Sequence, residues 1–187
     1  MDINVGTDSS PRSGARSWQA RLPRIEKVVK AEQPTILGTQ EGRGNQIRDL
    51  KDRLPGYWWA WRGREKDGSG ETCAAFYRKD RLEKLDEGHR WLSTTPTVPG
   101  SISWGAKTMI DGSFHDSWNH KAARVTPTYG TANGWRPRPK PDGRRIDWII
   151  ATERFAVHKA GINTWVTRHD NLCSDHWAVQ AVVSLAA

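Results

Sequence analysis

The sequence predicts a mixed α/β fold, and two adjoining segments carry that prediction. Residues Trp18–Lys30 place Leu22, Ile25, Val28 and Val29 at helical spacing, with Arg and Lys on the other face. After a break at Gln33-Pro34, the run Thr35–Glu41 predicts a buried strand that ends in a carboxylate. Helix, short turn and strand with a polar end is the order typical of α/β folds. A chain of 187 residues is expected to form one domain with a sizeable core.

The rest of the N-terminal half continues this pattern. Ile3-Asn4-Val5 is predicted to end a strand, which places Asn4 at the edge where ligands bind in α/β sheets. Gly63–Gly70, rich in glycine and charge, is predicted to form a hairpin connection. Around that connection we expect a helix and two strands, at Gln46–Leu54, Tyr57–Trp61 and Glu71–Arg78.

The middle of the chain is less regular. Leu82–Trp91 is predicted to be a short strand pair, and Ile110–Trp118 suits a helix end followed by a turn. Residues 136–141, which alternate cations with prolines, are expected to be extended and exposed. The cations there either contact phosphates or form a solvated loop, and the solvated loop is the more common case.

Two segments near the C-terminus carry candidate catalytic residues. Arg145–Ile150 predicts a core strand carrying Asp147, and Ser174-Asp175-His176 precedes a second predicted strand, Trp177–Val183. If these strands are neighbours, Asp147 accepts a hydrogen bond from His176 and leaves the other ring nitrogen free for a substrate. Asp175 then points to the opposite face, or into the same cleft as a metal-binding carboxylate. The alternative is an Asp–His pair that only stabilises a loop.

The amino-acid composition indicates which classes of binding partner to expect. Lys and Arg outnumber Asp and Glu by 29 to 21, a net charge of +8, which favours phosphate-bearing partners or marks a merely soluble basic protein. Eleven tryptophans are many for this length, and some are expected to line a pocket or stack on bases. No apolar run approaches a membrane span, and no secretion signal is visible, so the compartment is left open. We expect a monomer. Cys73 and Cys173 allow one disulfide without requiring it.

The order of several short segments resembles the endonuclease/exonuclease/phosphatase family, whose members have the DNase-I-like fold. Each segment is a weak signal by itself, but together they span nearly the whole chain. The matching segments are Ile3–Val5, Leu37–Glu41, Gly63-Arg64 with Gly70-Glu71, Ala75–Arg78, Trp91–Pro96, Pro99–Ser101, Arg145–Ile150 and Ser174–His176. The resemblance implies a layered sandwich of two mixed β-sheets flanked by helices.

The resemblance also implies site roles. Glu41, Asn4 and Asp175 are implied as ligands or close partners of a divalent cation, Mg²⁺ or Mn²⁺, with Glu41 the strongest candidate. His176, oriented by Asp147, is implied to engage the scissile phosphate or assist proton transfer, with Asp175 beside it. Arg64 and Asn4 are implied to bind the substrate phosphate. The implied reaction is attack of water on phosphorus in a nucleic acid, a phospholipid head group or a sugar phosphate.

Two segments expected from this family are missing from the chain. Neither Asn-Thr-His-Leu-Asp-His nor Gly-Asp-Phe-Asn occurs in the sequence. Both belong near residues 107–111, so the sequence predicts an internal deletion there and the loss of central strands in the second half. The second segment carries the water-activating Asp and a phosphate-holding Asn, so we expect weak or no activity.

Two other functions are compatible with these residues. The first is a non-catalytic, basic, Trp-rich binder of nucleic acid or phosphorylated ligands. The second is a zinc site formed by His169, Cys173 and His176, with Asp170 and Asp175 nearby.

Overall fold

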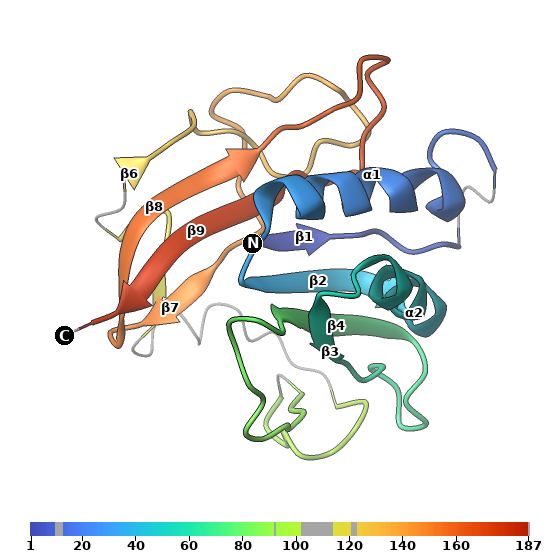
Figure 1. Cartoon of the computed structure of the whole chain (residues 1–187), viewed down its shortest axis with the longest axis vertical. Coiled ribbons are helices and arrows are strands. Elements are labelled where there is room, and N and C mark those ends of the chain that lie inside the picture. Colours follow the sequence, from blue (N-terminus) through green and yellow to red (C-terminus); the bar gives the residue numbers. More distant parts are fainter. Residues whose placement is uncertain (10–12, 92, 102–113, 121–122, 187) are drawn as a thin grey trace.

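A seven-stranded mixed sheet forms the centre of the computed structural model, which describes residues 1–187 except 10–12, 92, 102–113, 121–122 and 187. Its strand order is β3-β4-β2-β1-β9-β8-β6, and a separate two-stranded sheet pairs β5 with β7 (Figure 1). The helices are α1 (Trp18–Glu32) and α2 (Gly44–Arg53). The strands are β1 (Asp2–Asn4), β2 (Ile36–Arg43), β3 (Tyr57–Ala60), β4 (Glu71–Arg78), β5 (Phe114–Asp116), β6 (Ala123–Arg124), β7 (Ile150–Thr152), β8 (Phe155–Asn163) and β9 (Ala178–Leu185).

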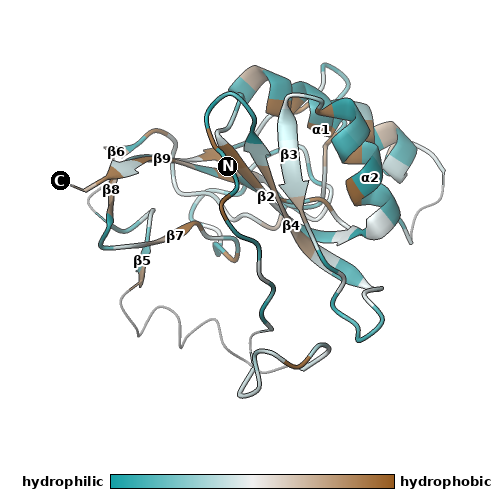
Figure 2. Cartoon of the chain, turned by 60° about the horizontal axis from the view of Figure 1, so that its bottom comes forward, coloured by the Kyte–Doolittle hydropathy of each residue, from teal (hydrophilic) through white to brown (hydrophobic). Residues whose placement is uncertain are grey.

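Helix α1 forms for reasons that are local. The Ser17 side chain accepts a hydrogen bond from the N–H of Ala20, which caps the first turn. At the other end Gln33 adopts a left-handed conformation (φ 43°), and its N–H donates to the carbonyl of Val29. The predicted apolar positions are buried, and Figure 2 shows hydrophilic and hydrophobic residues interspersed along both helices. The predicted helices and N-terminal strands are therefore confirmed.

The main core lies between the helices and one face of the sheet. The alternation of side chains along β4 shows which face is packed. Thr72, Ala74 and Phe76 are buried, whereas Cys73 and Ala75 are exposed. In β2 the buried positions on the same side are Leu37 and Thr39, both 0% exposed. Figure 2 shows α1 and α2 together on one side of the large sheet and the strands β5 and β7 on the other.

A second cluster of buried residues packs against β8 and β9. It consists of Trp118, Ala160, Ile162, Leu172, Trp177 and Val179. Most of its large side chains come from loops, not from a facing helix. The loops that carry Asp147 and His176 are therefore supported by their own core.

The region predicted as a core strand at Arg145–Ile150 is mostly not a strand. Only Ile150 belongs to β7, while Ile146 and Trp148 are 44% and 38% exposed. The N–H groups of Ile146 and Asp147 donate to the side-chain oxygen of Thr131, so a buried hydroxyl replaces the expected strand partner. In addition β7 pairs with β5 and not with β9, which contradicts the predicted strand neighbours.

Two further predictions of local structure are wrong. Leu82–Trp91 forms no strand; Leu82 and Leu85 are 37% and 92% exposed, so the segment has no apolar face to bury. Phe114–Asp116, predicted near a helix end, is strand β5, paired with β7 from Phe114↔Thr152 to Asp116↔Ile150. The predicted deletion at 107–111 lies outside the described residues, as do residues 110–113.

The structure also describes the two cysteines and the apolarity of the helices. Both cysteines are free, Cys73 on the surface and Cys173 buried, so no disulfide joins them. Within the described part of the chain, neither helix is long and apolar enough to span a membrane.

Candidate functional site

Asn4 and Glu41 meet because β1 and β2 run parallel. Their register pairs Asn4 with Gln40, so the two strands end at the same edge of the sheet. The Asn4 amide nitrogen donates to Glu41 Oε1 at 2.7 Å, and Asn4 Oδ1 accepts from the N–H of Gly6 at 2.9 Å. Both ends of the Asn4 amide are thus engaged, which suits it to orient Glu41.

Glu41 occupies an unusual backbone conformation. Its φ is +60°, a left-handed value that non-glycine residues rarely adopt. The β2–β4 pairing shifts register between Thr39 and Gly42, so Glu41 lies in a bulge. Bulges re-aim side chains and are frequent beside functional sites. Here the bulge interrupts the alternation of β2 at the residue that contacts Asn4.

His176 and Asp147 form the hydrogen-bonded pair that the sequence suggested. His176 Nδ1 lies 2.8 and 3.0 Å from the two Asp147 oxygens, and both side chains are largely buried. The pairing does not come from adjacent strands. Thr131 holds the backbone of Asp147, and the next residue, Ala132, forms an isolated bridge with His176.

Three carboxylates influence the pKa of His176. The hydrogen bond that His176 donates to Asp147 raises the pKa of His176, and the negative charges of Asp147, Asp175 and Glu41 raise it further, while burial opposes them. His176 Nε2 makes no hydrogen bond to any described residue, which leaves it available for a ligand.

Hydrogen bonds from two neighbouring segments hold Asp175 in place. Its carbonyl accepts from the N–H groups of Asn133 (2.7 Å) and Gly134 (3.1 Å), and Ser174 Oγ donates to its carboxylate at 3.2 Å. On the other side, an added Cβ at Gly6 would lie 3.4 Å from Asp175 Oδ1. The loop after β1 thus approaches Asp175, and a Cβ at Gly6 would be in van der Waals contact with it.

A buried arginine that the sequence did not single out ties these loops together. Arg21 is 1% exposed, and its guanidinium donates to the carbonyls of Val5, Gly6, Thr7, Arg16 and Cys173. Burial lowers its pKa, while Asp175 acts in the opposite direction. Arg21 therefore fixes the loop that follows Asn4 against the loop that carries Asp175.

Gln46 and Asp2 were also missed. Gln46 is 0% exposed; its side chain accepts from the N–H groups of Asp8 and Arg43 and donates to the carbonyl of Gly6. Burial raises the pKa of Asp2 to about 6, although its hydrogen bond with Gln40 opposes that shift. A polar residue on the apolar face of α2, beside Ile47 and Leu50, is the signal that could have revealed Gln46.

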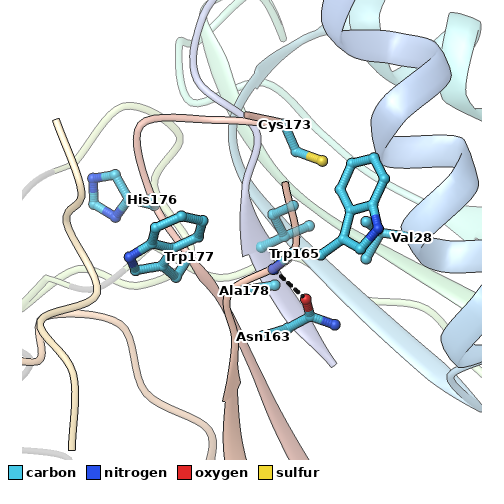
Figure 3. A pocket seen from close by; sticks show the side chains of 8 residues that line it. Val28, Asn163, Trp165, Cys173, His176, Trp177 and Ala178 are labelled. Carbon is cyan, nitrogen blue, oxygen red and sulfur yellow. Dashed lines mark hydrogen bonds between the residues drawn. The ribbon is translucent and has the colours of Figure 1, made fainter. Parts of the chain in front are cut away.

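The space behind His176 is not a substrate pocket. A cavity of about 10 Å³ lies among Val28, Trp165, Cys173 and Trp177, which is room for a single water molecule at most. Figure 3 shows Cys173 and Trp165 on one side of Trp177 and the His176 ring on the other. Burial raises the pKa of Cys173 to about 12, so its thiol is protonated at neutral pH.

Arg64 lies apart from these contacts. It is in the hairpin at the sheet edge, where its guanidinium is 3.3 Å from both Glu65 and Glu71. The structure records no contact between Arg64 and Asn4, Glu41 or His176, and its role at phosphate stays a prediction. Next to the hairpin, a wider cavity of about 420 Å³ is lined by Arg43, Gly44, Asn45, Arg48, Trp61, Asp67, Gly68, Ser69 and Gly70.

Among the described residues, no three His, Cys, Asp or Glu side chains are grouped to hold a metal ion. The zinc cluster considered from the sequence is therefore not assembled in that part of the chain: His169 contacts Arg168, and Cys173 carries a buried thiol. The binding of a harder cation by Glu41, Asn4 and Asp175 stays a prediction.

Comparison with solved structures identifies the fold as DNase-I-like. An endonuclease/exonuclease/phosphatase from Bacteroides vulgatus superposes with a TM-score of 0.86 at 24% identity, over 99% of this chain and 97% of that one. A mannosyl-6-phosphatase from Bacteroides thetaiotaomicron gives 0.84 at 23% identity, over 98% of each chain. TDP2 from D. rerio, complexed with a single-strand DNA product, gives 0.71 at 13% identity, over 98% of this chain and 97% of that one. No protein-family model and no curated protein matches the chain.

Proposed function

We propose that this protein is a divalent-metal-dependent phosphoester hydrolase whose activity is weak. The proposal is supported by two hydrogen-bonded pairs, Asn4–Glu41 and Asp147–His176, and by the negative charges of Glu41 and Asp175, which raise the pKa of His176. The names of the structural neighbours support it, since they include a mannosyl-6-phosphatase and a TDP2 bound to a DNA product.

Glu41 and Asp175 are the residues that would hold Mg²⁺ or Mn²⁺, since carboxylate oxygens suit these hard cations. Asn4 orients Glu41 through its amide, and its remaining N–H is free to donate to a phosphate oxygen. When bound, the cation polarises the phosphoryl group and offsets its negative charge. Asp147 keeps the His176 ring in one orientation, with Nε2 available to donate a proton to a phosphate oxygen or leaving group.

The weakness follows from what the chain lacks. The sequence lacks the Gly-Asp-Phe-Asn segment, to which the resemblance assigns the water-activating Asp, and loss of such a group lowers rates by about 10²–10⁴. We propose that the two-stranded β5–β7 sheet is the remainder of a second sheet whose central strands are missing. The predicted deletion near 107–111 would account for both losses.

Hydrolysis of bis(p-nitrophenyl) phosphate tests this proposal. We expect slow, Mg²⁺-dependent turnover that stops on addition of EDTA and is lost in His176→Ala and Glu41→Gln. His158→Ala is the matched control, because His158 is exposed and forms a hydrogen bond with Ser184, away from the candidate site residues. Fast turnover that His176→Ala abolishes would overturn the weakness, and turnover that survives EDTA would overturn the metal dependence.

Metal binding offers a second readout that does not need turnover. Mn²⁺ binding, followed by electron paramagnetic resonance, should weaken in Glu41→Gln and Asp175→Asn but not in Glu65→Gln, whose carboxylate lies in the hairpin. Unchanged Mn²⁺ binding in both site variants would argue against the assigned ligands. Salt-sensitive ligand binding with no Mn²⁺ effect would favour the non-catalytic binder.

A further inference from the structure

We propose that residues 134–145, called here the basic loop, bind the phosphate backbone of a nucleic-acid strand beside His176. This inference rests on the proposed function in one respect, because it takes that strand as the substrate. The binding surface itself is argued from the loop and requires neither metal nor turnover.

The basic loop starts and ends on the residues of the candidate site. At its start, Ala132 bridges to His176, and the N–H groups of Asn133 and Gly134 donate to the Asp175 carbonyl. At its end the chain continues into Asp147, the partner of His176. A ligand held along this loop is therefore delivered to the imidazole.

Backbone contacts close the loop across its base. Gly130 N–H donates to the Lys140 carbonyl at 3.1 Å, and Asp142 N–H donates to the Thr128 carbonyl at 2.9 Å. Gly130 and Gly143 approach so closely that a Cβ on Gly143 would lie 2.7 Å from the Gly130 Cα. Three prolines further restrict the backbone of residues 136–141. The loop thus presents its side chains in a preformed arrangement, which lowers the entropic cost of binding.

Four of the five cations of the loop are exposed and unpaired among the described residues, whereas Arg145 pairs with Asp116. Arg136, Arg138 and Lys140 are exposed, whereas the intervening Pro137 and Pro139 are half-buried. No described carboxylate pairs with any of these three cations or with Arg144. Elsewhere many cations are neutralised, for example Lys30 by Glu26 and Arg78 by Asp80. Cations repeated at every second position suit a ligand that carries repeated negative charges, as a nucleic-acid strand does.

An exposed aromatic ring at the end of the loop favours nucleic acid over other polyanions. Trp148 is 38% exposed and follows Asp147 directly. Trp135 is less available, because the guanidinium groups of Arg16 and Arg21 lie over its ring at 5.4 and 5.7 Å. A basic track next to an open indole is the combination that binds single strands through phosphate contacts and base stacking.

Fluorescence anisotropy with a labelled single-stranded 20-mer, in EDTA and over a series of NaCl concentrations, tests the inference. Replacing Arg136, Arg138 and Lys140 by Gln should weaken binding and flatten the plot of log K against log salt by about 2, since each phosphate contact contributes about 0.7. The matched control replaces Lys51, Arg53 and Arg81 by Gln, which removes the same charge from α2 and the end of β4. A third variant, Arg136→Lys with Arg138→Lys, should retain the wild-type slope.

The outcomes separate this inference from the proposed function. Glu41→Gln should abolish hydrolysis and leave oligonucleotide binding intact, so an inactive protein that binds with the predicted slope still supports the basic loop. Trp148→Ala should weaken binding without changing the slope. Equal slopes in the loop and control variants would overturn the inference, as would binding to anionic phospholipid vesicles with none to the oligonucleotide.

Discussion

At the scale of single residues, the site depends on charges that act on one imidazole. Asp147 bonds to His176 Nδ1, while Glu41 and Asp175 add negative charge nearby, and all three favour the protonated ring. A protonated His176 can donate from Nε2 to a phosphate oxygen or to a leaving group. The same charges that would attract a cation therefore also set the protonation of the proton donor.

The titration of His176 tests this arrangement. Its pKa should lie above the ordinary value of 6.5 and should fall in Asp147→Asn, because the first and largest cause of the shift is removed. Histidine NMR signals followed against pH measure this directly, with exposed His158 as the internal control. The stability that the pair contributes is full below pH 6.5 and is lost as pH rises through the raised pKa. An unchanged His176 midpoint in the variant would contradict the assignment.

At the scale of elements, α1 does more than cover the sheet. Its Arg21 reaches past the helix to five carbonyls on three segments, two of which flank the site. One turn later, Arg24 makes a single bond of this kind, to the Leu172 carbonyl at 2.6 Å. The helix thus anchors the loops after β1 and before β9 by satisfying carbonyls that would otherwise be buried without donors.

Replacing these two arginines separates anchoring from packing. Arg21→Met should lower the free energy of unfolding by about 3–5 kcal/mol, because several buried carbonyls lose their hydrogen-bond donor. Arg24→Met should cost only about 1 kcal/mol. Urea denaturation measures both. Similar costs for the two variants would show that Arg21 contributes little beyond its apolar stem.

At the scale of the whole molecule, packing against the large sheet is uneven. Leu37 in β2 is 0% exposed under the helices, whereas Leu185 at the end of β9 is 75% exposed. The neighbouring Val182 and Val183 are also exposed. In Figure 1 the ends of β8 and β9 extend away from the helices toward the C-terminus. The last residues of β9 are therefore less well packed than β2.

Two matched Leu→Ala substitutions in strands check this asymmetry. Leu37→Ala should lower the free energy of unfolding by about 2–5 kcal/mol, because it opens a cavity in the packed face. Leu185→Ala should change it by no more than about 0.5 kcal/mol. Denaturant midpoints measure the difference. A large cost at Leu185 would mean that a further layer, or a second molecule, covers the end of β9.

Several features could be determined from the sequence by itself. The helices Trp18–Glu32 and Gly44–Arg53 were predictable because their apolar spacing and their ends are local properties. The pairing of Asp147 with His176 was also anticipated, as was the edge position of Asn4 and Glu41. The position of Asn4 and Glu41 follows from strand order, which brings the ends of parallel strands to the same edge of a sheet. Asp147 and His176 meet although the strands predicted to carry them are not neighbours.

Only the tertiary structure decided how those residues are held. The strand predicted around Asp147 is replaced by a loop bonded to the Thr131 hydroxyl, a contact across 16 residues that no local pattern reveals. The bulge at Glu41 and the buried guanidinium of Arg21 likewise depend on distant backbone groups. Periodicity reports which face of an element is apolar, but the carbonyls and hydroxyls that receive each buried donor are chosen by packing.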